Sequence, residues 1–122
     1  MHSELEFPLL EYQVRLGCLE EEWEHPQRVQ ISIGLVFLQP PVAIETDRLA
    51  DTICYAEIAK RIAQVCCAKS YHLIEHLAWC CLREMVGIVG PNIQVKIAVS
   101  KLRPPAPYFG GPAIFRLQSP PL

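Results

Sequence analysis

The sequence predicts an α+β domain of two layers, in which two amphipathic helices cover one face of a four-stranded antiparallel sheet. Two strand-like segments come first, two helical segments follow, and two strand-like segments end the chain, so the order is β-β-α-α-β-β. The short connection between the first two strands makes them antiparallel neighbours. With 122 residues and no linker-like stretch, the chain is expected to form one domain over residues 1–122.

The first half of the chain predicts two strands. Apolar residues alternate with polar residues or glycine over 12–17, which indicates a half-buried strand, and a charged loop at 20–26 follows. A longer alternation over 28–37 predicts the second strand. The prolines at 40–41 end this strand because proline lacks the backbone N–H that a sheet requires. The segment from there to about Thr52 is expected to be irregular.

The second half predicts two helices and two further strands. Apolar residues recur at helical spacing over about 55–69 and again over 73–86. Ser70 is expected to cap the second helix, and Gly87, Gly90 and Pro91 to end it. The remaining elements are strands at 95–99 and 113–117, a proline-rich loop at 102–111 and a loose tail at 119–122.

Composition excludes several classes of function. The net charge is −2 and the basic residues are scattered, so neither a nucleic-acid-binding stripe nor a basic membrane-binding face is expected. Without a signal-like or membrane-spanning run, the protein is expected to be soluble and cytoplasmic. Hydrophobic residues make up 51% and charged residues 20%. This balance, together with two unpaired sheet edges, favours association with further subunits.

No metal site is expected from the cysteines and histidines. The neighbouring pairs Cys66-Cys67 and Cys80-Cys81 point about 100° apart on a helix, so they cannot chelate as Cys-x-x-Cys does. We expect them to be small buried side chains. His72 and His76 fit the spacing of the inverted zinc-protease signature H-x-x-E-H, but no third ligand is obvious downstream.

Four polar residues at the ends of apolar elements are candidates for chemistry. Glu75 lies near a helix start, where the helix dipole favours a carboxylate, and a structural role is as plausible as a functional one. Tyr55 begins the other helix, where a tyrosine more often packs. Lys101 ends a strand, a position that is usually solvated, and Glu22 lies in a charged run typical of a surface.

Together, four segments resemble the bacterial dihydroneopterin aldolase family in residue type, order and spacing. They are residues 17–27, 51–55, 73–78 and 100–107, and the resemblance extends over about 12–118. It implies the T-fold. In this fold, the sheets of several subunits join into a closed barrel, the subunits form a ring, and two rings stack on each other. A homo-octamer of two four-membered rings, with sites shared between subunits, is therefore expected.

The resemblance also implies roles for the candidate residues. Glu75 would grip the pterin edge, because one carboxylate can accept two parallel N–H donors, and backbone groups of Ile74 and Ile53 would complete recognition of the ring. Tyr55 would reach a neighbouring subunit's pocket and deliver a proton. Lys101 would exchange protons near neutrality, and Glu22 would help to place that lysine and a water molecule. The family requires no metal, Schiff base or other cofactor.

The implied reaction is retro-aldol cleavage of 7,8-dihydroneopterin in folate biosynthesis. One alternative is the related dihydroneopterin triphosphate 2′-epimerase, which residues 17–22 and 101–102 of this chain also resemble. The other is a non-catalytic pterin-binding T-fold protein. Two departures from the family bear on the pocket rim. The loop after Pro107 is about one residue shorter than in many relatives, and the last strand ends Arg116-Leu117-Gln118 in place of an acidic residue followed by arginine.

Overall fold

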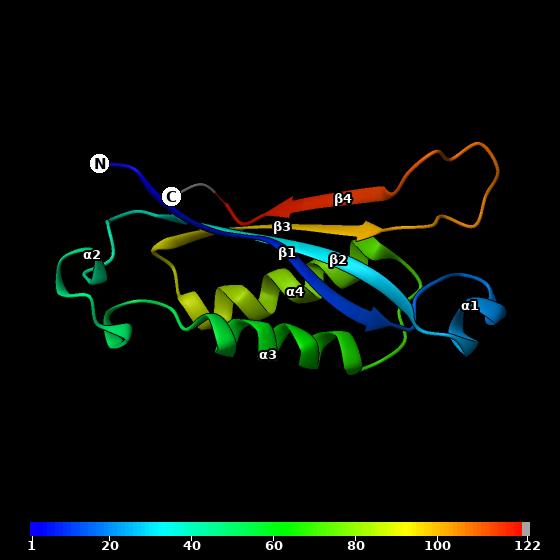
Figure 1. Cartoon of the computed structure of the whole chain (residues 1–122), viewed down its shortest axis with the longest axis horizontal. Coiled ribbons are helices and arrows are strands. Elements are labelled where there is room, and N and C mark those ends of the chain that lie inside the picture. Colours follow the sequence, from blue (N-terminus) through cyan, green and yellow to red (C-terminus); the bar gives the residue numbers. More distant parts are fainter. Residues whose placement is uncertain (121–122) are drawn as a thin grey trace.

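Figure 1 shows the computed structural model, which describes residues 1–120. Four strands and two long helices form the body of the molecule, and three short helical segments lie in the connections. In chain order the elements are β1 (Ser3–Val14), α1 (Glu20–Glu24), β2 (Gln27–Phe37), α2 (Ala43–Thr46), a 3-10 turn (Leu49–Asp51), α3 (Tyr55–Cys67), α4 (Ile74–Val89), β3 (Ile93–Lys101) and β4 (Ala113–Gln118).

The four strands form one antiparallel sheet in the order β1-β2-β3-β4, and α3 and α4 lie against one of its faces (Figure 1). The predicted fold class is confirmed. Alternation in the strands explains the two layers, because the residues of β2 and β3 that face the helices are almost completely buried. The helices contribute their buried stripes to the same core. The core side chains include Val29, Ile31, Ile33, Leu35, Val95, Ile97, Val99, Ile58, Ile62, Leu77, Cys81 and Met85.

β1 is longer than the sequence predicts. It begins at Ser3, whereas alternation indicated a start at Tyr12, and its register with β2 shifts between Phe7 and Leu10. This irregularity interrupts the period of two, which hid the first half of the strand. At its other end, Leu16 is no longer in the strand and forms an isolated bridge with Tyr71. This bridge ties the β1–β2 connection to the α3–α4 connection.

The ends of α4 also differ from the prediction. Its N-cap residue is Leu73, without a side-chain cap, so Ser70 does not cap the helix. The helix passes through Gly87 and ends at Val89, and Gly90 terminates it with φ +80°. Packing of the apolar stripe therefore extends the helix through a weak helix former.

The remaining sequence expectations are partly corrected. Cys66 and Cys81 are buried as expected, but Cys67 is exposed and Cys80 only half-buried. The charged loop contains α1, a helix of five residues. Ser119, expected in a loose tail, hydrogen-bonds to β3 through both its backbone N–H and its hydroxyl. Residues 121–122 of the expected tail lie outside the described residues.

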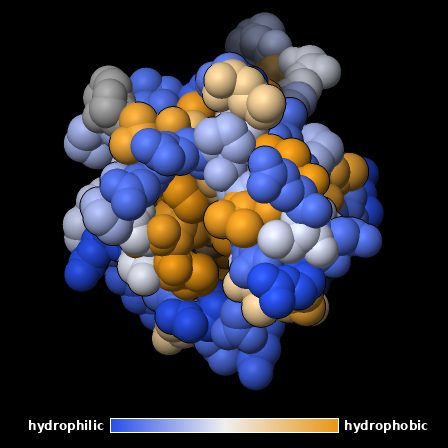
Figure 2. Space-filling model, turned by 90° about the vertical axis from the view of Figure 1, so that its left-hand side faces the viewer, coloured by the Kyte–Doolittle hydropathy of each residue, from blue (hydrophilic) through white to orange (hydrophobic). Residues whose placement is uncertain are grey.

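Strand register defines two opposite ends of the sheet. Val29 pairs with Lys101 at one end, and Phe37 pairs with Ile93 at the other. At about 3.3 Å per residue, these ends are roughly 26 Å apart. We call them the Lys101 end and the Ile93 end. Figure 2 views the Ile93 end, where apolar side chains surround a hollow of about 530 Å³ lined in part by Phe37, Ile53 and Ile93.

Candidate active site

An ion pair between Lys101 and Glu22 is the polar centre of the Lys101 end. Lys101 is the last residue of β3, and Glu22 lies in α1, within the β1–β2 connection. The Lys101 Nζ lies 2.8 Å from the Glu22 Oε2, and the two side chains are only 14% and 10% exposed. The fold thus brings together two residues that are far apart in the chain and that the sequence analysis selected separately.

Further hydrogen bonds fix the position of the Glu22 carboxylate. Gln27 donates from Nε2 to the Glu22 Oε2 at 3.0 Å, and the backbone N–H of Leu19 donates to Oε1 at 3.4 Å. The indole N–H of Trp23 donates to the backbone carbonyl of Gly17 at 2.8 Å, which holds α1 against the segment that follows β1. The carboxylate is therefore positioned before any ligand binds.

The pKa of Glu22 reflects this environment. Burial alone would raise it, but hydrogen bonds from Lys101 and Gln27 and the positive charge of Lys101 hold the pKa of the Glu22 carboxyl below its ordinary value of 4.5. The carboxylate is therefore ionised at neutral pH and holds the ammonium group at the end of β3. A paired ammonium and carboxylate at a partly open site can bind a water molecule and exchange protons with a ligand.

Glu75 lies at the same end of the molecule. It occupies the first turn of α4, and the segment before this helix is joined to the end of β1 by the Tyr71 N–H, which donates to the Arg15 carbonyl at 2.8 Å. The side chain of Glu75 is exposed, and the positive end of the helix dipole stabilises its carboxylate. Ile74 is half-buried beside it. A carboxylate in this position is available to a ligand that offers N–H donors.

Tyr55 and Ile53 lie at the opposite end. Tyr55 begins α3, is 63% exposed, and contacts Phe7 edge-on with ring centroids 5.3 Å apart. Ile53 lines the hollow at the Ile93 end. Within one chain the structure therefore places four candidates, Lys101, Glu22, Glu75 and Ile74, at the Lys101 end, and Tyr55 and Ile53 toward the other end.

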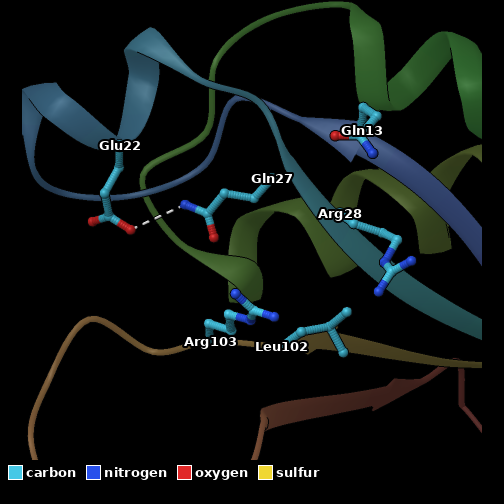
Figure 3. Close-up of a pocket in the computed structure, with 6 residues that line it drawn as sticks. All are labelled: Gln13, Glu22, Gln27, Arg28, Leu102 and Arg103. Atoms are coloured by element: carbon cyan, nitrogen blue, oxygen red, sulfur yellow. Dashed lines mark hydrogen bonds between the residues drawn. The ribbon is translucent and has the colours of Figure 1, made fainter.

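A pocket of about 450 Å³ opens beside Glu22 (Figure 3). The sequence analysis gave no role to five of its lining residues. Gln27 follows Glu22 closely in the sequence and begins β2, so its nearness to Glu22 was the only signal. The arginines carried none, because sequence does not show which strand ends meet. The lining residues are Gln13, Glu22, Gln27, Arg28, Leu102 and Arg103.

The histidines that match the zinc-protease spacing have separate surroundings. The Nε2 of His76 lies 2.7 Å from the Lys69 Nζ, whereas the His72 ring packs against Trp23 with centroids 4.8 Å apart. In residues 1–120, no three His, Cys, Asp or Glu side chains gather closely enough to hold a metal ion. No helix within the described residues is both long and apolar enough to cross a membrane.

Gly17 leaves the space that the Glu22 carboxylate occupies. Its φ is +144°, and a Cβ at this position would lie 2.3 to 2.6 Å from the three carboxyl atoms of Glu22. We expect Gly17→Ala to displace the carboxylate from Lys101 and to lower the free energy of unfolding by about 1–3 kcal/mol. Urea unfolding and a crystal structure of the variant measure the two effects.

Gly87→Ala is the matched control for this substitution. Gly87 lies inside α4, and a Cβ there has no neighbouring atom within 4 Å. Since alanine favours a helix more than glycine does, this change should stabilise the protein by about 0.5–1 kcal/mol. A Gly17→Ala protein with wild-type stability and an intact Lys101–Glu22 contact would contradict the steric argument.

The lowered pKa of Glu22 predicts how pH changes stability. A carboxyl whose folded-state pKa is lowered stabilises the protein fully above the unfolded value of 4.5, and that contribution is lost as pH falls through the folded pKa. The difference in unfolding free energy between wild type and Glu22→Gln should therefore shrink between pH 7 and pH 3. Urea unfolding at successive pH values tests this, and a difference that stays constant would refute it.

Comparison with known proteins places the chain in a family. Residues 8–114 match the FolB family model, described as dihydroneopterin aldolase. Probable dihydroneopterin aldolases of two chlamydial species are similar over 105 residues. The protein of Chlamydia trachomatis serovar D is 35% identical, with 85% of each chain covered. That of Chlamydia muridarum is 32% identical, with 85% of this chain and 86% of the relative covered.

Solved structures have the same fold. Dihydroneopterin aldolase of E. coli, solved in complex with neopterin, matches with a TM-score of 0.82 at 19% identity over 97% of this chain and 99% of that one. A putative dihydroneopterin aldolase of Vibrio cholerae matches with a TM-score of 0.80 at 16% identity, covering 96% of both chains. Taken with the sequence matches, which span most of the chain, this shows that the protein belongs to the dihydroneopterin aldolase family of folate biosynthesis.

Proposed function

We propose that this chain cleaves the side chain of 7,8-dihydroneopterin by a retro-aldol reaction, giving 6-hydroxymethyl-7,8-dihydropterin and glycolaldehyde. The observation that carries the proposal is the Lys101–Glu22 pair at 2.8 Å, because the reaction needs a group that exchanges protons with both a hydroxyl and a ring nitrogen. Membership of the aldolase family supports the same reaction.

Glu75 is the proposed anchor for the pterin ring. The 2-amino-4-oxo edge of a pterin presents two adjacent N–H donors, and one ionised carboxylate accepts both. Backbone groups of Ile74 and Ile53 complete the recognition. The Burkholderia relative whose fold matches this chain was solved bound to guanine, a base with the same type of amino-oxo edge, and the E. coli relative was solved with neopterin. Both ligands support recognition through that edge.

The proximity of Lys101 to Glu22 supports the following proton transfers. A water molecule held by Lys101 and Glu22 takes the proton of the 2′-hydroxyl, and the bond between C1′ and C2′ breaks to release glycolaldehyde. The electrons of the broken bond pass through C6 to N5. Lys101 protonates N5, and an enamine results. Return of the N5 proton and protonation of C1′, for which Tyr55 is the proposed donor, give the hydroxymethyl product.

We also propose that the reaction needs neither a metal ion nor a Schiff base. The C6=N5 bond of the substrate already accepts the electrons that a metal-bound enolate or a lysine imine accepts in other aldolases. Lys101 is engaged by Glu22 as an ammonium group, which suits it to donate a proton rather than to attack a carbonyl.

A complete site requires two chains in this proposal. Ile53 lines the hollow at the Ile93 end, Tyr55 follows it two residues later, and the two ends of the sheet are roughly 26 Å apart, so the Ile93 end of one subunit would meet the Lys101 end of another. Within residues 1–120 the outer strands β1 and β4 each have one unpaired edge, and exposed apolar side chains such as Val42 and Ile44 lie near the Ile93 end. Four-membered rings that pair as an octamer satisfy both requirements.

The 2′-epimerase is the second candidate, since it would use the same proton transfers and re-form the bond with the opposite configuration. A pterin-binding protein without turnover is the third. Product chromatography after incubation with dihydroneopterin and with its triphosphate separates the three. We expect the hydroxymethyl product, with unchanged rate after exhaustive EDTA treatment. Formation of the epimer alone, or of no product, would overturn the proposed aldolase reaction. Zinc-dependent activity would overturn the proposal that the reaction needs no metal ion.

Substitutions of Lys101 and Glu75 should have different effects on pterin binding and turnover. Glu75→Ala leaves two pterin N–H donors unpaired, which should weaken pterin binding by about 2–3 kcal/mol or more. Lys101→Ala should keep most of the affinity and lose turnover, because its role belongs to the reaction. Fluorescence titration with neopterin measures affinity in both variants. Equal losses of affinity would show that the roles are misassigned.

Mixed oligomers test the shared site. Tyr55→Phe and Glu75→Ala should each be nearly inactive, but chains of the two variants, unfolded together and refolded, can place an intact Tyr55 beside an intact Glu75. With random mixing of equal amounts, roughly a quarter of the sites should be whole. Mass spectrometry confirms that mixing occurred. A mixture no more active than the separately refolded variants would show that each site lies within one chain.

A further inference from the structure

Two arginines face the pocket beside Glu22. Arg28 lies on β2 and Arg103 on the segment that follows β3, and both guanidinium groups lie in the space between these segments (Figure 3). The sheet register brings these two segments side by side, because Val29, which follows Arg28, pairs with Lys101 at the end of β3. Gln13, also in the lining, adds a side-chain amide that can hydrogen-bond to a ligand.

The charges of this pocket do not cancel. The ammonium group of Lys101 neutralises the Glu22 carboxylate. Arg103 has no carboxylate partner among residues 1–120. Arg28 has one distant partner, with its Nη1 3.8 Å from the Glu11 Oε2, and both of these side chains are largely exposed, so this contact contributes little. The pocket therefore holds about two positive charges available to an anion.

The position of the pocket identifies the part of the substrate it would meet. In the proposed function, Lys101 and Glu22 act at the 2′-hydroxyl, and the chain of the substrate continues from there to the primary hydroxyl on C3′. Glu22 is both the partner of Lys101 and part of the pocket wall. A group attached to the 3′-oxygen would thus enter the space that contains Arg28 and Arg103.

We propose that Arg28 and Arg103 bind a phosphate ester on the 3′-oxygen, so that the preferred substrate is dihydroneopterin 3′-phosphate. This inference rests on the proposed function. A phosphate monoester carries nearly two negative charges at neutral pH, and the planar fork of a guanidinium group can donate two hydrogen bonds to its oxygens. Two arginines therefore match one phosphate in charge and in donors.

The reaction of this substrate balances without any co-reactant. The bond between C1′ and C2′ breaks, the 2′-hydroxyl becomes the aldehyde, and a proton is placed on C1′. The products are 6-hydroxymethyl-7,8-dihydropterin and glycolaldehyde phosphate. The phosphate ester bond is neither formed nor hydrolysed, so the two arginines bind the leaving fragment and take no part in the proton transfers.

Two measurements test the proposal. In the first, kcat/KM is compared for dihydroneopterin and its 3′-phosphate, and the phosphate should be favoured by about tenfold or more, since two charge-assisted contacts are gained. Arg28→Gln and Arg103→Gln should each reduce this ratio by about tenfold, and high salt should reduce it in the wild type. Arg83→Gln, which removes an exposed arginine stacked over Trp79 on α4, is the control and should leave the ratio unchanged.

The second measurement needs no turnover. Neopterin and neopterin 3′-phosphate are titrated by fluorescence into wild type and the three variants. Tighter binding of neopterin 3′-phosphate that depends on Arg28 and Arg103 supports the phosphate site even if neither substrate is cleaved. Absence of cleavage would overturn only the proposed function. Equal affinity for the two ligands, or a preference that both pocket variants retain, overturns the phosphate site and leaves the aldolase proposal standing.

Discussion

The contact between Lys101 and Glu22 is the interaction on which the polar end of this molecule depends. It joins the last residue of β3 to the connection between β1 and β2, so it fixes a strand end and a loop at once. The pair is mostly buried, and such pairs are stable only when further hydrogen bonds satisfy both ions. Gln27, the Leu19 N–H and the space left by Gly17 provide that support for the carboxylate.

The fold follows from the sequence wherever one periodicity is uninterrupted. Apolar residues at every second position of β2 and β3 determine which face meets the helices, and the stripes of α3 and α4 complete the core. Prediction failed where tertiary contacts override a local pattern. The register shift in β1 conceals its first half, and α4 runs through Gly87 because its neighbours are packed against the sheet.

The candidate site could be predicted only in part from the sequence. Lys101, Glu22, Glu75 and Tyr55 could be selected because their segments keep the family spacing, but their relative positions are a property of strand register. The arginines of the pocket illustrate the limit most clearly. Arg28 looks like one more polar residue in an alternating strand, and Arg103 like a loop residue. Only the pairing of β2 with β3 shows that the two share a pocket.

The distance between the two ends of the sheet affects how many complete sites an assembly of several chains can form. When each complete site needs the Lys101 end of one chain and the Ile93 end of the next, an open row of chains leaves one half-site unused at each of its two ends. A closed ring leaves none, so it forms as many sites as it has chains. In the proposed assembly, ring closure would therefore add a working site as well as an interface, and selection for activity would favour closed assemblies over open ones.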